Sequence, residues 1–215
     1  MPVLRIASVD DDTATRLGLA LLLPMFDFVG QYSSVRALLS DQPDVDVVML
    51  DLGLDASGPN VQGSAAVRAV ARAGHRVLIY TNEPRRDVLA WCFSQGAQGL
   101  VEKSEPMDAV ERAVRAVAAG RTVLTQEMIG LVALADRRGL IGGLTSRQRE
   151  VLSARARGES FASIGERLFI SPRTAEDHWA HVAHKFSEYL VSHSPADLER
   201  MLGIGPGDVL DDPGT

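Results

Sequence analysis

The chain has a single cysteine, Cys92, among its 215 residues, and only 5% of its residues are aromatic. One cysteine excludes an internal disulfide framework and a zinc site built on cysteines, and we interpret Cys92 as a small buried residue of a helix. No apolar run is long enough to cross a bilayer, and residues 1–6 lack the pattern of a secretory signal peptide. We therefore expect a soluble, cytoplasmic protein.

Strongly basic segments are also missing. The net charge is −6, and the most basic stretch, residues 144–190, has seven basic and six acidic side chains. Lys and Arg make most contacts with nucleic-acid phosphates, so any nucleic-acid contact depends on few side chains. The chain is 46% hydrophobic and 23% charged, which is typical of globular proteins, and it is long enough for two small domains.

Short apolar runs alternate with helical patterns over the first 120 residues. The alternation predicts an α/β domain with a doubly wound, five-stranded parallel sheet. Strands are expected at residues 3–9, 26–32, 45–50, 76–80 and 99–101, and helices at a segment ending near Pro24 and at 34–40, 63–73, 84–95 and 104–119.

After residue 125 the pattern is helical throughout, which predicts a second, small all-α domain. We expect a linker helix at 126–138, a glycine-rich hinge at 139–143, and helices at 146–157, 160–168, 171–186 and 195–202. The expected division is 1–122 for the first domain, 123–143 for the linker, 144–190 for the second domain, and 191–215 for a C-terminal helix and an acidic, disordered tail.

Asp51 directly follows the apolar run 45–50 and precedes a loop rich in turn-forming residues. In open α/β sheets, ligands and chemistry lie just beyond the carboxyl ends of such strands. On this stretch alone, two interpretations remain open: Asp51 is a functional carboxylate, or it caps the next element.

Polar side chains also follow the other strands. Asp10 and Asp11 follow the first strand, Thr81 the fourth and Lys103 the fifth. Because parallel strands end at one edge of the sheet, these groups can meet Asp51. Clustered carboxylates repel and need a cation, and their oxygens suit Mg²⁺. A carboxylate beside Mg²⁺, with a lysine and a hydroxyl, can attack a phosphoryl group.

Residues 3–120 resemble the receiver domain of two-component response regulators, since Arg16, Gly18 and Leu19 continue the acidic pair as they do in that family. The resemblance implies phosphorylation of Asp51. It also implies the following roles: Asp11, Asp51 and the carbonyl of Gly53 bind the metal directly and Asp10 binds it through water, while Thr81 and Lys103 contact the phosphoryl group.

The chain departs from the receiver pattern in two places. Leu54 and Asp55 replace the usual Met-Pro, the loop before Gly63 is about four residues longer, and Asp55 adds a carboxylate that can compete for the metal. Leu100 replaces a common aromatic switch residue. Tyr80 is either a partial substitute for that aromatic or a buried strand residue.

Residues 144–188 resemble the LuxR-type helix-turn-helix of NarL/FixJ-type regulators. Ser171 and Pro172 form a strong helix start, and a core stripe follows at Ala175, Trp179, Val182 and Phe186. The residues expected to contact DNA are Arg173, Thr174, Glu176, Asp177, His181 and Lys185.

Two features of this helix complicate DNA binding. Glu176 and Asp177 stand where the family commonly has a lysine and a small residue; an acid can accept from cytosine N4 but repels phosphate. His178, His181 and His184 could bind a metal, but each step of three residues turns the helix face and no cysteine is near. We favour solvated or phosphate-facing histidines.

The sequence therefore predicts a non-enzymatic DNA-binding response regulator. Its expected partners are a sensor histidine kinase, promoter DNA and, when active, a second copy; no membrane is involved. One alternative is a phosphorylation-independent regulator, controlled by a partner protein or ligand, with reduced DNA affinity. Another is a Mg²⁺-dependent phosphatase that uses Asp51 as nucleophile, although no further substrate site is visible in the sequence.

Overall fold

The structure, a computed structural model, describes residues 3–54, 62–193, 197, 200 and 203. Asp55, most of the helix predicted at 195–202 and the acidic tail lie outside the described residues. None of the described helices is long and apolar enough to cross a membrane.

The N-terminal part is a five-stranded, fully parallel sheet in the order β2-β1-β3-β4-β5, which confirms the predicted fold class. The strands are β1 (Arg5–Val9), β2 (Asp27–Tyr32), β3 (Val47–Leu50), β4 (Val77–Thr81) and β5 (Gly99–Glu102). The helices that follow them are α1 (Thr13–Leu22), α2 (Val35–Asp41), α3 (Gly63–Arg72), α4 (Arg86–Ser94) and α5 (Met107–Ala118).

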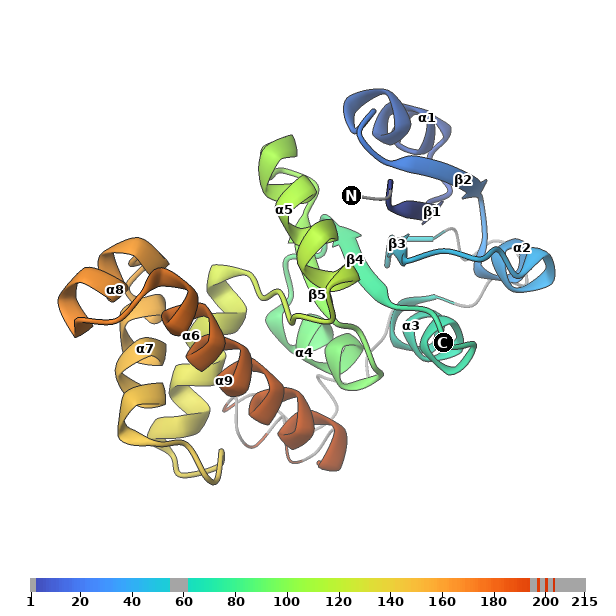
Figure 1. The fold of residues 1–215 in the computed structure, drawn as a ribbon. Coiled ribbons are helices and arrows are strands. Elements are labelled where there is room, and N and C mark those ends of the chain that lie inside the picture. The colour runs from blue at the N-terminus through green and yellow to red at the C-terminus, as the bar shows by residue number, and fades with distance from the viewer. Residues whose placement is uncertain (1–2, 55–61, 194–196, 198–199, 201–202, 204–215) are drawn as a thin grey trace.

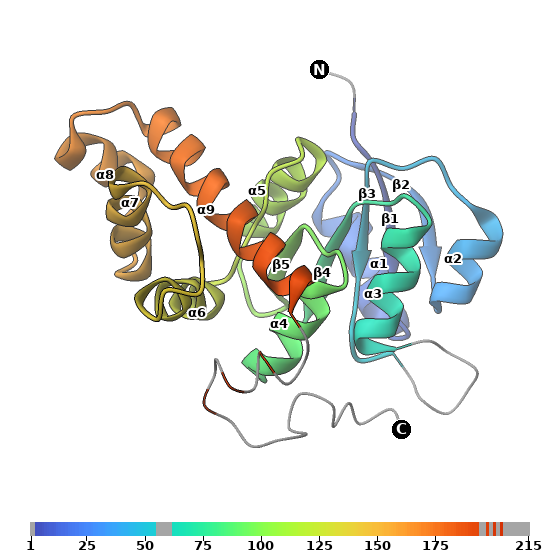
Figure 2. The same ribbon diagram turned by 90° about the horizontal axis from the view of Figure 1, so that it is seen from below.

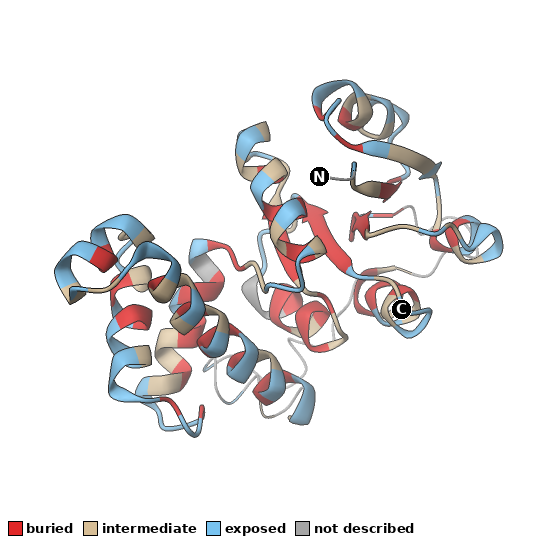
Figure 3. Ribbon diagram, in the orientation of Figure 1, coloured by how far each residue is buried: buried red, intermediate tan, exposed pale blue. Residues whose placement is uncertain are grey.

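Helices cover both faces of this sheet, so the central strands are buried on both sides (Figures 1 and 3). Successive side chains of a strand point to opposite faces. Val47 and Met49 of β3 accordingly pack in the core shared with α1 and α5, whereas Val48 and Leu50 pack in the core shared with α2, α3 and α4. Burial on both faces explains why β3 is an unbroken apolar run in the sequence.

The C-terminal part consists of helices, as predicted. They are α6 (Gln126–Arg137), α7 (Ser146–Ala156), α8 (Phe161–Leu168) and α9 (Pro172–Ser192). The predicted end of the last of these, near residue 186, was wrong by six residues. Tyr189 and Leu190 continue the apolar stripe three and four residues beyond Phe186, and all three side chains are buried, so packing extends the helix.

One hydrophobic core runs through both parts of the molecule. A single cluster of buried side chains extends from β3 and α4 through α6 to α7 and α9, and it includes Phe93, Met128, Val151 and Phe186. Figures 1 and 2 both show α9 crossing from the helical part to α4. The two predicted domains are therefore packed together in this conformation.

Candidate functional site

The strand-end side chains meet at one edge of the sheet. Asp10 directly follows β1, Asp51 follows β3, Thr81 ends β4 and Lys103 follows β5. Lys103 Nζ lies 2.8 Å from Asp10 Oδ2 and 2.8 Å from Asp51 Oδ2. Asp10 and Asp51 are only 1% and 7% exposed, so one lysine is shared by two buried carboxylates and weakens the repulsion between them.

This arrangement shifts the pKa of Asp10 and the pKa of Lys103. Burial raises the pKa of Asp10 above its ordinary value, although the hydrogen bond from Lys103 opposes the shift. Burial alone lowers the pKa of Lys103, but its hydrogen bonds to Asp10 and Asp51 outweigh that effect, so the pKa of Lys103 is raised. Lys103 therefore remains a cation at neutral pH, held by both carboxylates.

Asp11 completes a group of three carboxylates. Asp10, Asp11 and Asp51 each offer one oxygen, and these oxygens lie within 4.8 Å of one another. In the part of the chain that the structure describes, no other group of three or more His, Cys, Asp or Glu side chains has metal-binding spacing, and His178, His181 and His184 do not form one. Three hard oxygen donors at this spacing suit a divalent cation such as Mg²⁺.

The backbone of the acidic loop is fixed by its own residues. Asp10 Oδ1 accepts the Asp12 N–H at 2.9 Å, and Asp12 caps α1 by accepting the Ala14 N–H at 2.8 Å. Arg16 Nη1 donates to the carbonyls of Asp10 and Asp11 at 2.5 and 2.9 Å. The sequence marked Arg16 only as part of a family pattern; its contacts show that it holds the carboxylate-bearing turn in place.

A cavity of 250 Å³ opens beside Asp51 and Lys103. Its lining also includes Gly53, Thr81, Asn82, Glu83 and Pro84. The Thr81 hydroxyl accepts the Glu83 N–H at 3.3 Å, and the Thr81 carbonyl accepts the Lys103 N–H at 3.0 Å. The cavity thus offers a carboxylate, an ammonium group and a hydroxyl to one small ligand.

Tyr80 and Leu100 lie on opposite faces of the sheet. Tyr80 packs in the core shared with α1 and α5, whereas Leu100 packs in the core on the α3 and α4 side. The Tyr80 ring is 6.0 Å from Lys103 Nζ, and burial raises the pKa of its hydroxyl. Tyr80 is therefore a buried strand residue and does not occupy the place of the missing aromatic at position 100.

A larger cavity, of 410 Å³, lies between α6 and α7. Its acidic residue, Asp136, already accepts from Arg149 at 3.0 Å, and Arg157 pairs with Glu159 at 2.7 Å. It brings together no cluster of carboxylates or nucleophiles, so we place the candidate site at the smaller cavity.

The turn between α8 and α9 depends on two backbone features. A side chain at Gly165 would place its Cβ only 2.8 Å from the Ile170 carbonyl, which excludes larger residues. Phe169 adopts a left-handed conformation (φ 56°) although it is not a glycine. Ser171 then caps α9 by accepting the Thr174 N–H at 3.0 Å, and Pro172 starts the helix.

The predicted core stripe of α9 is present: Ala175, Val182 and Phe186 are fully buried and Trp179 is 7% exposed. The residues predicted to contact DNA differ in their exposure to solvent. Arg173, Asp177, His181 and Lys185 are exposed, Thr174 and Glu176 are half-buried, and the Thr174 hydroxyl lies 2.8 Å from the Ser171 hydroxyl of the cap.

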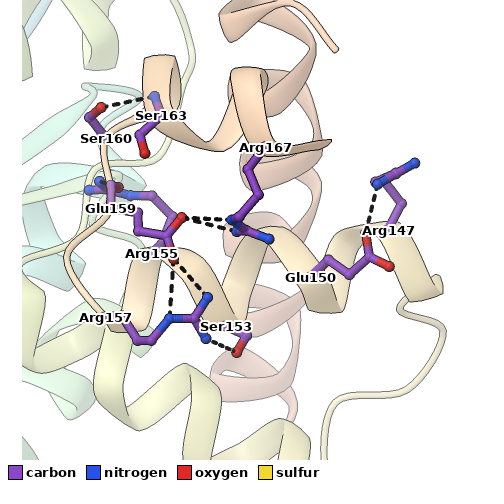
Figure 4. A network of polar contacts seen from close by, with 9 residues as sticks. All are labelled: Arg147, Glu150, Ser153, Arg155, Arg157, Glu159, Ser160, Ser163 and Arg167. Atoms are coloured by element: carbon purple, nitrogen blue, oxygen red, sulfur yellow. Dashed lines mark hydrogen bonds and ion pairs between the residues drawn. The ribbon is translucent and has the colours of Figure 1, made fainter. Parts of the chain in front are cut away.

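Arginines of α7 and α8 are engaged in a network around Glu159 (Figure 4). Glu159 accepts from Arg157 Nη2 at 2.7 Å and from Arg167 Nη2 at 3.0 Å, and Arg155 Nη1 donates to its backbone carbonyl at 2.6 Å. The hydrogen bond from Arg157, with that from Arg167, lowers the pKa of the Glu159 carboxyl. The network links α7, α8 and the turn between them. The sequence did not reveal this role.

Residues 143–188 match the GerE family, described as bacterial regulatory proteins of the luxR family. The response regulator RamR of Streptomyces coelicolor is 32% identical over 189 residues, which are 85% of this chain and 89% of RamR. The transcriptional regulatory protein FixJ of Rhizobium meliloti is 30% identical over 210 residues, which are 92% of this chain and 96% of FixJ.

A solved structure gives the same result. The crystal structure of the response regulator ChrA of a heme-sensing two-component system is similar over 94% of this chain and 100% of ChrA, with 27% identity and a TM-score of 0.51. Matches of this extent cover both the parallel sheet and the helical part. The chain therefore belongs to the response regulators of two-component systems, with a receiver domain followed by a LuxR-type helix-turn-helix.

Proposed function

We propose that the protein is a DNA-binding transcriptional regulator whose activity is controlled by phosphorylation of Asp51. The observation that carries this proposal is the pairing of Lys103 with both Asp10 and Asp51 at the edge of a cavity. The named relatives RamR and FixJ, a response regulator and a transcriptional regulatory protein, support the same function.

In the proposed reaction, a carboxylate oxygen of Asp51 attacks the phosphorus atom of a phosphohistidine on a sensor kinase. The new P–O bond forms as the P–N bond breaks, and the imidazole leaves. Lys103 then pairs with the transferred phosphoryl group, and the Thr81 hydroxyl donates a hydrogen bond to it. These contacts stabilise negative charge on the phosphoryl oxygens.

Asp10, Asp11 and Asp51, with the carbonyl of Gly53, are the residues that would hold Mg²⁺. The ion would neutralise charge on the phosphoryl oxygens during transfer. Gly53 lines the same cavity as Asp51 and Lys103. We propose that phosphorylation takes place in the cytoplasm, that promoter DNA is the target and that a homodimer is the active form. We assign residues 1–122 to the receiver domain, 123–143 to the linker, 144–190 to the DNA-binding domain and 191–215 to the tail.

Phosphorylation is tested by intact mass after incubation with Mg²⁺ and acetyl phosphate. We expect the mass of one added phosphoryl group on the wild-type protein, and none on Asp51→Asn or in the presence of a chelator. Asp46→Asn is the matched control, because Asp46 lies near the start of β3, at the opposite end of the strand from the cavity. A phosphoryl group that persists on Asp51→Asn contradicts the assignment to Asp51. A wild type that gains no phosphoryl group contradicts the proposal and favours control without phosphate.

DNA binding is tested by titrating labelled promoter DNA at several salt concentrations. Each phosphate contact made by Lys or Arg makes the slope of the logarithm of the binding constant against the logarithm of the salt concentration steeper by about 0.9. Arg173 and Lys185 are the exposed basic residues of α9 among those predicted to contact DNA, so we expect a shallow slope that falls by about one in Arg173→Gln. Binding that does not respond to salt would contradict contacts with the DNA backbone.

A further inference from the structure

Glu176 of α9 is paired with the receiver domain. Arg121 Nη1 lies 3.2 Å from Glu176 Oε2, and the two side chains are 50% and 40% exposed. The two residues are 55 positions apart in the chain, so the pair exists only while the helix-turn-helix is packed on the receiver.

Arg121 is firmly attached to the receiver side of this contact. Its N–H donates to the Ala116 carbonyl of α5 at 2.9 Å. Two residues later, the Val123 N–H donates to the Gln98 carbonyl at 3.0 Å, and the Val123 carbonyl accepts from Leu100 at 3.1 Å. The segment therefore runs along β5, and Arg121 presents its charge from a fixed backbone.

The other end of α9 is held by apolar contacts. Figures 1 and 2 both show the C-terminal turns of α9 beside α4, and the two helices are in contact. Tyr189 and Leu190, on these turns, are 7% and 0% exposed. The helix predicted to contact DNA is thus held at two places, by an ion pair near its start and by packing near its end.

The charge of Glu176 fits this contact better than it fits DNA. A carboxylate at a position that faces DNA repels phosphate, but the same carboxylate attracts Arg121. We propose that Arg121 and Glu176 form a latch that holds α9 against the receiver in the unphosphorylated protein, so that DNA binding requires this ion pair to open. This inference rests on the proposed DNA-binding function and gives Glu176 a regulatory role in place of base recognition.

Loss of a positive charge ordinarily weakens binding to DNA. The latch predicts the opposite for Arg121, namely tighter binding when its charge is removed. An exposed ion pair shifts an equilibrium only modestly, so Arg121→Gln should tighten DNA binding of the unphosphorylated full chain by about two- to five-fold. Arg112→Gln is the matched control, because Arg112 is an exposed receiver arginine whose ion pair, among the residues that the structure describes, is with Asp108 of its own helix. It also removes one positive charge, and we expect no increase in affinity.

The experiment measures dissociation constants for Arg121→Gln, Glu176→Gln and the double variant. The probe is a labelled duplex selected from a random-sequence pool with the wild-type full chain. If the latch exists, Arg121→Gln tightens binding in the wild-type background and has no further effect when residue 176 is Gln. Equal effects in both backgrounds, or no effect in the wild-type background, overturn the inference.

Hydrogen exchange without DNA separates this inference from the proposed function. In Arg121→Gln, opening of the latch should speed amide exchange in α4 and in the C-terminal turns of α9 and leave exchange in α1 unchanged. In Arg112→Gln, exchange in all three helices should match the wild type. If no form of the protein binds the duplex, the proposed function fails and exchange alone decides the latch. Unchanged exchange in α4 and α9 overturns it.

Discussion

Replacement of Lys103 by Met should lower the free energy of unfolding by about 3 kcal/mol when divalent cations are absent, because it removes the charge shared by two buried carboxylates. Asp10 and Asp51 would then face each other across the position of the lost ammonium group, with their side chains 2% and 9% exposed. The measurement is urea unfolding in the presence of a chelator, with stability extrapolated to zero denaturant.

Mg²⁺ should restore much of this loss, since a divalent cation held by the carboxylates replaces the missing charge. A ligand that binds only the folded state adds stability that grows with its concentration, and we expect a larger gain for Lys103→Met than for the wild type. Asp51→Asn is the control: it removes one of the two repelling carboxylates and leaves Lys103 paired with Asp10, so its loss of stability should be smaller than that of Lys103→Met. A Lys103→Met protein as stable as the wild type with chelator, or unaffected by Mg²⁺, would contradict the argument.

Much of the candidate site could be predicted because parallel strands impose its geometry. Once Asp10, Asp51, Thr81 and Lys103 were each assigned to the end of a strand, the shared edge of the sheet brought them together without any knowledge of side-chain contacts. Which oxygens Lys103 contacts was not predictable. That depends on how the strands are offset, and the sequence does not encode the offset in any local pattern.

The position of Tyr80 shows the same limit. In the sheet, Tyr80 is aligned with Val101, and Leu100 is aligned with Ile79. Aligned residues of neighbouring strands share a face, so Tyr80 and Leu100 must point to opposite sides. Without the register, both interpretations of Tyr80, as a partial substitute for the missing aromatic or as a buried strand residue, stayed open. The pairing of β4 with β5 decides for the buried strand residue.

The contact between the two parts of the chain was hidden for a different reason. The stripe on α9 correctly predicted that Phe186 is buried, but periodicity identifies only an apolar face and not the element that covers it. The sequence therefore predicted a separate small domain. In the structure, the stripe continues to Leu190, and its buried side chains belong to one core with those of α4 and β3.

This shared core predicts a large effect for Phe186→Ala. The side chain is fully buried, so its truncation should lower the free energy of unfolding by about 3–5 kcal/mol through lost contacts and the cavity left behind. Phe169→Ala is the matched control: Phe169 belongs to the same helical part but is 95% exposed, and its change should stay within about 0.5 kcal/mol.

The shape of the unfolding transition then shows whether the core acts as one unit. If the receiver and the helix-turn-helix are coupled as the structure indicates, Phe186→Ala should lower a single transition when unfolding is followed both by circular dichroism and by the fluorescence of Trp91, which lies on α4 of the receiver. If the midpoint measured by circular dichroism falls while the midpoint measured by Trp91 fluorescence stays at its wild-type value, the two parts fold independently. Trp179 lies on α9 and is therefore replaced by Phe in all proteins compared, so that Trp91 is the one remaining tryptophan.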